Sequence, residues 1–586
     1  MEPLGRWFAG NCKFASSEPV IGPPVKVDAV SQRIIDTVLA VAQEFGLSTT
    51  FRVAGGWVRD NLLGVTSDDL DFALDDMTGA RFASYMADYC DRHPNCGISE
   101  AHEIKANPDK SKHLATVTVV IHGLKVDFVN LRVETYGESR IPTMEMGTPD
   151  SDARRRDLTI NALFYNVHTG QVEDFLGGQG LKDLGLDTGT IVIRTPRDPG
   201  KGQLESTVRI FRDDPLRMLR ALRFYSRYPN AVMDPSIVDA LSMPEVQERF
   251  TYVRGKKSEK PGAEDEPDKG VAPSRSGPEL IKLFQGAKPA EALRLMYGSG
   301  FDKKVFDVPG YNALMDLTME QRNPYHAYTL LEHTMKVVEN MNKVANEAGL
   351  PKDTRGLLNF AALFHDLGKA KPGVGKPKEK DPAHYTYENH EQFSADIADE
   401  ILRHVDVGSD DRQFVEMMVA MHMRPHRHRV GPEQPAWTPK AMGRFVRETR
   451  PHGKEDLAKD WWKYAMMLSM ADVMSKGTGD IEAETAERWE HIKGFEEFLK
   501  PAPQKASLMK PLLNGHDLIK MFPDIKPTRI IDGKNFIKYI QDKMLDGQAT
   551  GDITPDNVRE KVMEIAAEMP DYRSTEAWVD SNCKLG

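Results

Sequence analysis

Apolar residues follow two different spacings in the first third of the chain. In residues 31–46, SQRIIDTVLAVAQEFG, they recur every three or four positions, which predicts an amphipathic helix. The next two segments, TTFRVAG and DLDFAL, are short and strand-like. Two later apolar runs, ATVTVVIHG and KVDFVNLR, are joined by a turn that contains glycine, which predicts paired strands. The pattern over residues 29–175 is therefore typical of a region that mixes α and β structure.

The rest of the chain has mostly helical spacing. Two polar stretches rich in proline, glycine and lysine interrupt it, at 254–278 and 369–382, and the first predicts a mobile insert. We therefore expect a multidomain chain that is α+β first and all-α afterwards. The expected segments are an N-terminal arm at 1–28, the mixed region at 29–175, a helical region at 176–316, a second helical region at 317–500 that carries most of the histidines, and a helical tail at 501–586.

Composition narrows the class of protein. The chain has 586 residues, enough for about three or four domains, and no run approaches the ~18 apolar residues of a membrane span. Its first residues lack the long apolar core of a secretory signal. The formal net charge is −11, so a nucleic-acid partner requires a local basic surface. The cysteines, which include no CxxC pair, argue against a disulfide framework or a thiolate zinc site and predict a reducing, cytoplasmic location. They are Cys12, Cys90, Cys96 and Cys583.

The segment FRVAGGWVRDNLLGVTSDDLDFAL carries the first candidate site. Val53 ends an expected strand, and Gly55 and Gly56 allow a tight turn in which no side chain blocks the backbone. A triphosphate can then approach the amides at the start of the next helix. Arg59 lies one helical turn further along and is placed to meet phosphate oxygens, while Asp60 beside it can anchor the turn.

Three carboxylates accompany this turn. Asp69 and Asp71 are two residues apart on an expected strand, so both side chains point to the same face. Asp127, in KVDFVNLR, is a natural third carboxylate on a neighbouring strand. Acidic groups on one face are what paired Mg²⁺ ions require, and such a site can activate a hydroxyl and stabilise a pyrophosphate leaving group.

Four motifs in a fixed order resemble those of a known family. GGWVRD, SDDLDFAL, RRRDLTINALFYN and DDPLRMLRALRF together resemble the class II CCA-adding enzymes and bacterial poly(A) polymerases of the nucleotidyltransferase superfamily, over about 50–310. The resemblance implies a polymerase beta-like, mixed-sheet nucleotidyltransferase head at 29–175 and a helical neck and body at 176–316. It implies that Asp69 and Asp71 bind the catalytic metals. The residues implied for the triphosphate are Gly55, Gly56 and Arg59, and those implied for the ribose and phosphates are Arg155, Arg156, Asp157 and Asn161.

The motif RDDPLRMLRALRF is expected to select the base. Asp214 and Arg217 are three residues apart, which predicts that they share one face of a helix. The resemblance implies that this pair reads the base edge of CTP or ATP as a protein template, since a carboxylate accepts from an exocyclic amine and a guanidinium donates to ring acceptors. Arg220 continues along the helix and is expected to steady the base or the phosphates. Where many relatives have Glu-Asp, this chain has Asp213 before Asp214.

Histidines and aspartates in the second helical region form a second candidate site. Each histidine lies on its own expected helix, and the order H…HD…H…H…D is rare by chance. Imidazole and carboxylate together suit Mn²⁺, Fe²⁺, Ni²⁺, Co²⁺ or Mg²⁺ better than a thiolate-type zinc site. The residues are His333, His365, Asp366, His390, His422 and Asp472.

This arrangement resembles the HD-domain phosphohydrolases over about 325–480. The resemblance implies an all-helical HD domain at 317–500 in which a bridging Asp366 holds one or two metals that activate water. It implies that the primary metal is bound by His333, His365, Asp366 and Asp472, and a second metal by His390 and His422. Lys369 follows the HDLG turn and either meets a substrate phosphate or complements the dipole at a helix end.

The whole chain is expected to add CCA to the 3′ end of tRNA from CTP and ATP, using Mg²⁺ in the head. The HD domain is expected to repair damaged 3′ ends as a 2′,3′-cyclic phosphodiesterase or phosphatase, because nucleotide transfer needs a free 3′-hydroxyl. The alternatives are a poly(A) polymerase, an enzyme that adds only CC or only A, and an HD phosphohydrolase with a nucleotide-sensing front half. No membrane partner is expected, and the sequence leaves the oligomeric state open.

Overall fold

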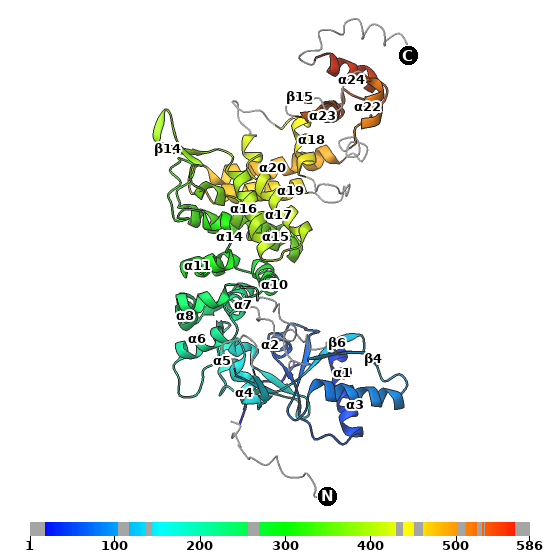
Figure 1. Ribbon diagram of the computed structural model, residues 1–586, viewed down its shortest axis with the longest axis vertical. Coiled ribbons are helices and arrows are strands. Elements are labelled where there is room, and N and C mark those ends of the chain that lie inside the picture. Colours follow the sequence, from blue (N-terminus) through cyan, green and yellow to red (C-terminus); the bar gives the residue numbers. More distant parts are fainter. Residues whose placement is uncertain are drawn as a thin grey trace, which may run out of the picture. The chain divides into compact units, whose positions relative to one another are not determined.

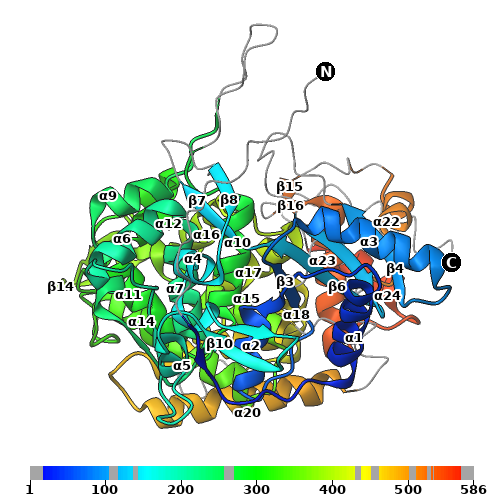
Figure 2. The ribbon, with the colours of Figure 1, turned by 90° about the horizontal axis from the view of Figure 1, so that it is seen from below.

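Figures 1 and 2 show the computed structural model of the chain. It describes residues 18–103, 116–135, 143–255, 269–428, 437–449, 461–500, 510–523, 525, 530–531 and 534–568. The chain divides into two compact units. The first comprises Met1–Asp307 with His404–Asp406, and the second comprises Val308–Arg403 with Val407–Gly586.

An eight-stranded sheet forms the centre of the first unit. Its order is β1–β10–β9–β2–β3–β6–β5–β4, and every neighbouring pair is antiparallel except β3 and β6. The parallel pair places Asp71 directly opposite Asp127. The strands are β1 (Val20–Ile21), β2 (Phe51–Ala54), β3 (Leu70–Leu74), β4 (Ile98–Glu103), β5 (Val117–Ile121), β6 (Leu124–Asn130), β9 (Phe164–Asn166) and β10 (Gln171–Asp174).

Helices α1 (Ala29–Glu44) and α3 (Gly79–Arg92) lie side by side against this sheet (Figures 1 and 2). Apolar residues at helical spacing in α1, among them Ile34, Val38 and Val41, are buried, as the pattern predicts. The first residue of α3 must be glycine, because a Cβ at Gly79 would lie 2.2 Å from the carbonyl oxygen of Phe128 in β6. This close approach fixes α3 against the strand that carries Asp127.

Two shorter helices carry parts of the head motifs. Helix α2 (Gly56–Leu62) contains most of GGWVRD, and α4 (Pro149–Arg155) ends within RRRDLTINAL. The hairpin β7 (Arg132–Thr135) and β8 (Thr143–Met146) lies between β6 and α4, and the residues that join its strands, 136–142, are outside the described part.

Helices then dominate the first unit, as expected, with one addition. The addition is a two-stranded parallel pair, β11 (Ile191–Ile193) and β12 (Ala231–Met233). The helices are α5 (Gln179–Leu184), α6 (Gln203–Asp213), α7 (Leu216–Arg227), α8 (Pro235–Leu241), α9 (Pro244–Gln247), α10 (Pro273–Phe284), α11 (Pro289–Gly298) and α12 (Asp302–Val305).

The insert predicted at 254–278 is shorter than expected. Val253 pairs with Lys269 in an antiparallel bridge, and α10 already begins at Pro273. Proline is favoured in the first turn of a helix, where its missing N–H costs no bond, so here it starts a helix and does not mark a loop. Residues 256–268 of the predicted insert lie outside the described part of the chain.

The second unit is built from helices around α19 (Trp461–Met474). This helix, WWKYAMMLSMADVM, is buried almost all round, as a hydrophobic helix without a polar face must be. It packs against α14 (Leu330–Glu347), α15 (Lys352–Phe364), α17 (Ser409–Met421) and α20 (Ile481–Leu499). The other elements of this part are α13 (Pro309–Asn312), the 3₁₀ turns η3 (Leu367–Ala370) and η4 (Pro425–Arg427), α16 (His390–His404) and α18 (Pro439–Glu448).

The segment 369–382 contributes a β-hairpin, which adds to the all-helical description of this region. Its strands are β13 (Gly375–Lys378) and β14 (Asp381–Tyr387), and Figure 1 shows it extending outward from the helices of the unit.

The C-terminal tail has its own hydrophobic core. Its elements are α22 (Gly515–Met521), β15 (Ile530–Ile531), β16 (Lys534–Asn535), α23 (Phe536–Thr550) and α24 (Val558–Ala567). Leu518, Phe536, Ile540 and Val562 are among the residues that meet in this core.

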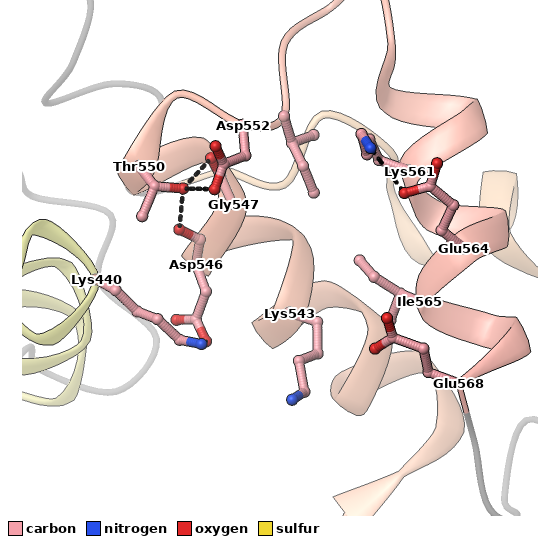
Figure 3. Close-up of a pocket in the computed structure, with 11 residues that line it drawn as sticks. Lys440, Lys543, Asp546, Gly547, Thr550, Asp552, Lys561, Glu564, Ile565 and Glu568 are labelled. Carbon is pink, nitrogen blue, oxygen red and sulfur yellow. Dashed lines mark hydrogen bonds and ion pairs between the residues drawn. The ribbon is translucent and has the colours of Figure 1, made fainter.

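One buried carboxylate joins the tail to α18. Asp546 of α23 accepts hydrogen bonds from Arg444, and from Arg447 at 2.9 Å. Figure 3 shows the surface pocket of about 210 Å³ beside it. Three lysines and four carboxylates line this pocket, and several are paired with one another, as Lys561 is with Glu564 at 2.7 Å. The pocket therefore presents no surface of one charge.

Two cysteines differ from the sequence prediction. Cys90 near the end of α3 and Cys96 before β4 are joined by a disulfide, with their Cα atoms 5.6 Å apart. The prediction considered only CxxC spacing, whereas the turn between α3 and β4 brings together two cysteines six residues apart.

None of the helices in the described ranges is both long and apolar enough to cross a lipid bilayer.

Candidate functional site

The head carboxylates meet at the one parallel strand pair of the sheet. Asp71 lies on β3 opposite Asp127 on β6, and Asp69 immediately precedes β3. Thr118 on the next strand donates a 2.6 Å hydrogen bond to Asp127, which orients that carboxylate. Burial and the neighbouring charge of Asp69 raise the pKa of Asp71 to about 7, against the opposing effect of Arg156. Carboxylates that repel one another in this way suit a hard divalent cation.

The glycine turn lies beside these acids. Gly55 has φ of +74°, a conformation that favours glycine, and its N–H donates to the carbonyl oxygen of Leu163 at 2.9 Å. A Cβ at Gly55 would also lie 2.9 Å from Nη1 of Arg156. The nearest atom to a Cβ at Gly56 is Nη2 of Arg59, at 3.7 Å, so the steric demand for glycine is at position 55.

Arg59 is buried and already has partners. Its Nε and Nη2 each donate to Asp60 at 2.9 Å, and its Nη1 donates to the side chain of Asn161. The guanidinium also lies 4.9 Å from the ring centre of Phe224 in α7. Arg59 therefore connects the glycine turn to the second motif and to the neck helix, and a phosphate would have to compete with these contacts.

The arginines of RRRDLTINAL are held by one buried acid. Asp152 accepts hydrogen bonds from Arg155 at 2.8 Å and from Arg156 at 3.1 Å. Burial raises the pKa of Asp152, but the two guanidinium groups outweigh that effect and lower it overall. Arg156 also donates to the carbonyl oxygen of Asn161 at 3.1 Å. Arg156 thus lies between the glycine turn and the carboxylates, whereas Arg155 is occupied by Asp152.

Asp157 links this motif to the neck. It accepts 2.7 and 2.6 Å contacts from Arg220 of α7 and a 3.0 Å hydrogen bond from Asn161. Burial opposes ionisation of Asp157, but Arg220 and Asn161 outweigh it and hold its pKa well below the ordinary value. Arg220 also contacts Glu279 of α10 at 3.3 Å, and Arg223 contacts Glu279 at 2.6 Å. One network of charges therefore runs from the glycine turn through α7 to α10.

The geometry predicted for Asp214 and Arg217 is wrong. Asp214 follows the last residue of α6 with extended backbone angles, φ −140° and ψ 102°, and α7 begins only at Leu216. The two residues therefore do not share a helical face. Asp214 instead accepts a 2.8 Å hydrogen bond from Arg275 of α10, and the buried Arg217 donates to the carbonyl oxygen of Ile210 at 3.3 Å.

Asp213, the first acid of this motif, has a role of its own. It accepts a 2.7 Å hydrogen bond from Arg209, which also contacts Asp198 at 2.7 Å. This pair fixes the end of α6 just before the turn to α7.

The histidine–aspartate set of the second unit does converge. Oδ2 of Asp366 lies 3.4 Å from Nε2 of His333 and 3.2 Å from Nε2 of His365. Its Oδ1 lies 3.0 Å from Nε2 of His390 and 3.7 Å from Nε2 of His422. Asp366 is thus shared between two groups of donors. One group consists of His333, His365 and Asp472, and the other of Asp366, His390 and His422, with the ligand atoms of each group within 4.8 Å of one another.

The backbone fixes how these histidines face the centre. The Nδ1 atoms of His365, His390 and His422 lie 2.8, 2.6 and 2.7 Å from the carbonyl oxygen three residues earlier, and that of His333 lies 3.2 Å from the carbonyl oxygen of Ser475. The ring proton therefore belongs on Nδ1, so each Nε2 presents a lone pair. All four Nε2 atoms, and Oδ1 of Asp366 and of Asp472, are buried without a hydrogen-bond partner in the described structure. Orphaned imidazole and carboxylate atoms that converge in this way fit a divalent metal ion.

The acids of this centre are strongly held in the ionised form. Burial raises the pKa of Asp366, but His365 and Lys369 outweigh it and hold the pKa well below its usual range. Asp472 behaves in the same way because of His333 and His426. Lys369 is not free for a substrate, since its Nζ lies 2.7 Å from Asp366 and 3.0 Å from the side-chain oxygen of Gln321.

Two residues at this centre escaped the sequence analysis. Nε2 of His426 lies 2.9 Å from Oδ2 of Asp472, and Gln321 holds Lys369. His426 lies in the basic run MRPHRHR, in which nothing in the spacing singles out one histidine. No sequence signal identifies Gln321, which reaches the site from a loop before α14.

Comparison with protein families defines the class of both regions. Residues 51–189 match the poly A polymerase head domain, and residues 330–460 match the HD domain. Two segments of the chain therefore match the two classes of domain that the motifs predict, and the resemblance and fold class are confirmed. Both types of domain imply dependence on divalent metal ions.

Two yeast relatives each match less than half of the chain. The mitochondrial CCA tRNA nucleotidyltransferase of Saccharomyces cerevisiae is 41% identical over 261 residues, 44% of this chain and 42% of the relative. The tRNA nucleotidyltransferase cca2 of Schizosaccharomyces pombe is 39% identical over 265 residues, 44% of this chain and 48% of the relative. The chain thus spans less than half the length of these two relatives.

A solved structure extends the likeness in fold. The Bacillus stearothermophilus CCA-adding enzyme in complex with CTP aligns over 92% of this chain and 98% of that chain, with a TM-score of 0.51 and 15% identity. At this level of identity the likeness concerns the fold alone.

Proposed function

We propose that the head unit adds CCA to the 3′ end of tRNA, using CTP and ATP and releasing pyrophosphate. The observation that carries this proposal is the placement of Asp71 opposite Asp127 on parallel strands, with Asp69 just before β3 and close enough to raise the pKa of Asp71. The relatives named as CCA tRNA nucleotidyltransferases support the choice of tRNA and of CCA.

Each residue of the head has a proposed part in the transfer. Asp69 and Asp71 bind two Mg²⁺ ions, which when bound supply activation of the 3′-hydroxyl and stabilisation of the leaving pyrophosphate. Asp127, oriented by Thr118, completes the acidic face. The turn at Gly55 and Gly56 admits the triphosphate to the backbone, where Arg156 and Arg59 supply positive charge.

We propose that Arg155, Arg156, Asp157 and Asn161 surround the ribose and phosphates of the incoming nucleotide. Asn161 donates to Asp157, and Arg155 is held in place by Asp152. Base selection falls to Asp214 and Arg217, with Arg220 as their support. Because Asp214 contacts Arg275 and Arg217 contacts the carbonyl oxygen of Ile210, reading a base requires both to exchange these partners for the base edge.

For the second unit, we propose a phosphohydrolase that removes 2′,3′-cyclic, 2′- or 3′-phosphates from RNA ends. His333, His365, Asp366 and Asp472 bind the primary metal, and His390 and His422, sharing Asp366, bind a second. The imidazole-rich set favours Mn²⁺, Fe²⁺, Ni²⁺ or Co²⁺ over Mg²⁺, and a bound metal supplies activated water. Lys369 steadies Asp366, and it can meet a substrate phosphate only by giving up its contacts with Asp366 and Gln321.

The division of labour follows the expected segments: a nucleotidyltransferase head at 29–175, a nucleotide-reading and tRNA-binding region at 176–316, and an HD phosphohydrolase at 317–500. The location proposed from the sequence is cytoplasmic. The Saccharomyces cerevisiae relative is named as a mitochondrial enzyme. A localisation experiment therefore has a mitochondrial location as its competing outcome.

An incorporation assay tests the function of the head. A tRNA transcript that ends before its CCA is incubated with Mg²⁺ and each nucleotide, separately and together, and the products are sequenced. Two additions from CTP, then one from ATP, then a stop is the expected result. A long tail from ATP alone identifies a poly(A) polymerase, and addition of only CC or only A identifies a partial enzyme.

If nothing is added while phosphate is released from 3′-phosphorylated or cyclic ends, the head only senses nucleotides and the HD centre carries the function.

A further inference from the structure

The hairpin β13–β14 packs against the loop that supplies Gln321. The backbone N–H of Tyr385 donates to the carbonyl oxygen of Arg322 at 2.6 Å, and the hydroxyl of Tyr387 donates to the carbonyl oxygen of Gln321 at 2.6 Å. These bonds join the end of β14 to the residues just before α14. The hairpin is therefore anchored to the HD centre at its base, although its turn extends outward (Figure 1).

Gln321 and Lys369 connect this anchor to the metal-binding acids. The side-chain oxygen of Gln321 accepts from Lys369 at 3.0 Å, and Lys369 contacts Asp366 at 2.7 Å. Lys369 also lies 5.9 Å from the ring centre of Tyr387. A molecule bound along the hairpin base would thus lie next to the residues around Asp366.

Aromatic rings alternate with cations at this place. The guanidinium of Arg322 lies 5.4 Å from the ring centre of Tyr385, and Nζ of Lys378 lies 5.9 Å from the ring centre of Tyr325. Tyr325 is 52% exposed, unusually open for a large ring. We call Arg322, Tyr325, Lys378, Tyr385 and Tyr387 the tyrosine–lysine surface.

Two features of the backbone favour a binding role for this surface. Arg322 has φ of +46°, a left-handed conformation that is uncommon for residues other than glycine and that clusters at functional sites. On β14, Tyr385 and Tyr387 are two residues apart, so their rings lie on one face of the hairpin. Gly375 lies opposite Tyr387, and a Cβ there would approach that ring to 2.9 Å.

We propose that the tyrosine–lysine surface binds the single-stranded 3′ end of an RNA and directs it to the HD centre. Single-stranded nucleic acids are held by base stacking on aromatic rings combined with cations that follow the phosphates, and the surface supplies both. The proposal rests on the proposed phosphohydrolase function and adds to it the surface that holds the RNA strand next to the HD centre.

An acidic peptide fits the same surface less well. It can satisfy Arg322 and Lys378, but it offers no flat base to an exposed ring such as Tyr325. Because three tyrosines and two cations share the surface, stacking should contribute as much to binding as charge does.

The test measures RNA binding apart from catalysis. A labelled single-stranded 8-mer RNA with a 3′-hydroxyl is titrated with the full chain in chelator, and fluorescence anisotropy gives Kd. Replacement of the exposed Tyr325 together with the half-buried Lys378, Tyr325→Ala with Lys378→Ala, is expected to raise Kd on the order of tenfold, the effect of losing one stacked base. Tyr325→Phe, which keeps the ring, should retain most of the binding. Lys493→Ala, at an exposed lysine on α20, is the matched control and should leave Kd unchanged.

Two further arms separate the failure of this proposal from failure of the phosphohydrolase function. Loss of binding in the double variant without any phosphate release by the wild-type chain supports the surface and contradicts the hydrolase. Phosphate release from a 3′-phosphorylated 8-mer with the same KM in the wild type and the double variant supports the hydrolase and overturns the surface. A Kd within twofold of wild type, or displacement of the RNA by polyglutamate at equal charge, also overturns it.

Discussion

The acids of the head and those of the HD centre lie in opposite electrostatic surroundings. In the head, burial and repulsion from Asp69 raise the pKa of Asp71 to about 7, and Arg156 only partly compensates. In the HD centre, histidines and a lysine outweigh burial and hold the pKa values of Asp366 and Asp472 well below the ordinary range. The same residue type thus has a raised pKa in one site and a lowered pKa in the other.

This difference indicates how each site obtains its metal. Among the described residues, no histidine is grouped with the head carboxylates, so a hard cation that arrives with a nucleotide triphosphate both binds and relieves the repulsion. The HD histidines are fixed through Nδ1 to backbone carbonyls, which orients Nε2 toward the acids before any metal binds. We therefore expect an exchangeable metal in the head and a resident one in the HD centre.

The largest effect is expected when a head carboxylate is removed. Asp69→Ala should lower nucleotide incorporation by more than the ~100-fold that loss of an outer-shell partner costs, because it deletes a direct ligand. Incorporation of labelled CTP into a tRNA lacking CCA measures it. Asp68→Ala, at the exposed neighbouring residue, is the control, and equal activity of the two variants would exclude Asp69 as a ligand.

The second prediction concerns the resident metal. His422→Ala should lower the metal retained per chain after dialysis against a mild chelator, because His422 and His390 share Oδ1 of Asp366. Elemental analysis of the purified chain measures the content. His384→Ala, which removes an exposed histidine paired with Asp381, should leave it unchanged. Equal metal content in His422→Ala and the wild type would contradict the assignment of the second donor group.

The third prediction concerns stability in the head. Asp157→Ala should lower the free energy of unfolding by about 2–3 kcal/mol, less than the ~3–5 kcal/mol for a fully buried pair, because Arg220 keeps its contact with Glu279. Differential scanning calorimetry of the full chain measures the change. Asp150→Ala, which breaks the more exposed pair with Arg154, should cost less than about 1 kcal/mol. Equal losses would contradict the role of Asp157 as the link to the neck.

The smallest effect is a pH dependence of the metal-free head. The pKa of Asp71 is about 7 in the folded chain, against an ordinary value of 3.8 for the unfolded chain. Between pH 3.8 and about 7 the folded state therefore binds more protons than the unfolded state. The stability that the raised pKa of Asp71 contributes is full at low pH and is lost as pH rises toward about 7. In chelator, the melting temperature of wild type should therefore fall relative to that of Asp71→Asn over this range, and Mg²⁺ should reverse the fall. A wild-type curve parallel to that of Asp71→Asn would show that Asp71 is not perturbed.

Local spacing predicted the parts of both sites that depend on one element. The alternation along β3 placed Asp71 on the face that meets Asp127, and each HD histidine follows from its position on a helix or at a helix end. The order of the motifs was enough to assign both domains, because it reflects local chemistry at fixed points of the chain.

Contacts between distant segments could not be predicted in the same way. Asp214 was expected to share one face of a helix with Arg217, but it lies before α7 and contacts Arg275, which α10 brings from 61 residues away. His426 meets Asp472 only because η4 packs against α19. The segment 369–382 has the composition of a loop, yet it forms a hairpin because Tyr385 and Tyr387 gain partners on the loop before α14.

The most direct test of two independent sites is to measure both activities in one preparation of each of three chains. Wild type, Asp71→Ala and Asp366→Ala are assayed for incorporation into a tRNA lacking CCA and for phosphate release from a 3′-phosphorylated RNA. We predict that Asp71→Ala loses only incorporation and Asp366→Ala loses only phosphate release. Loss of both activities in either variant, or survival of incorporation in Asp71→Ala, would contradict the account.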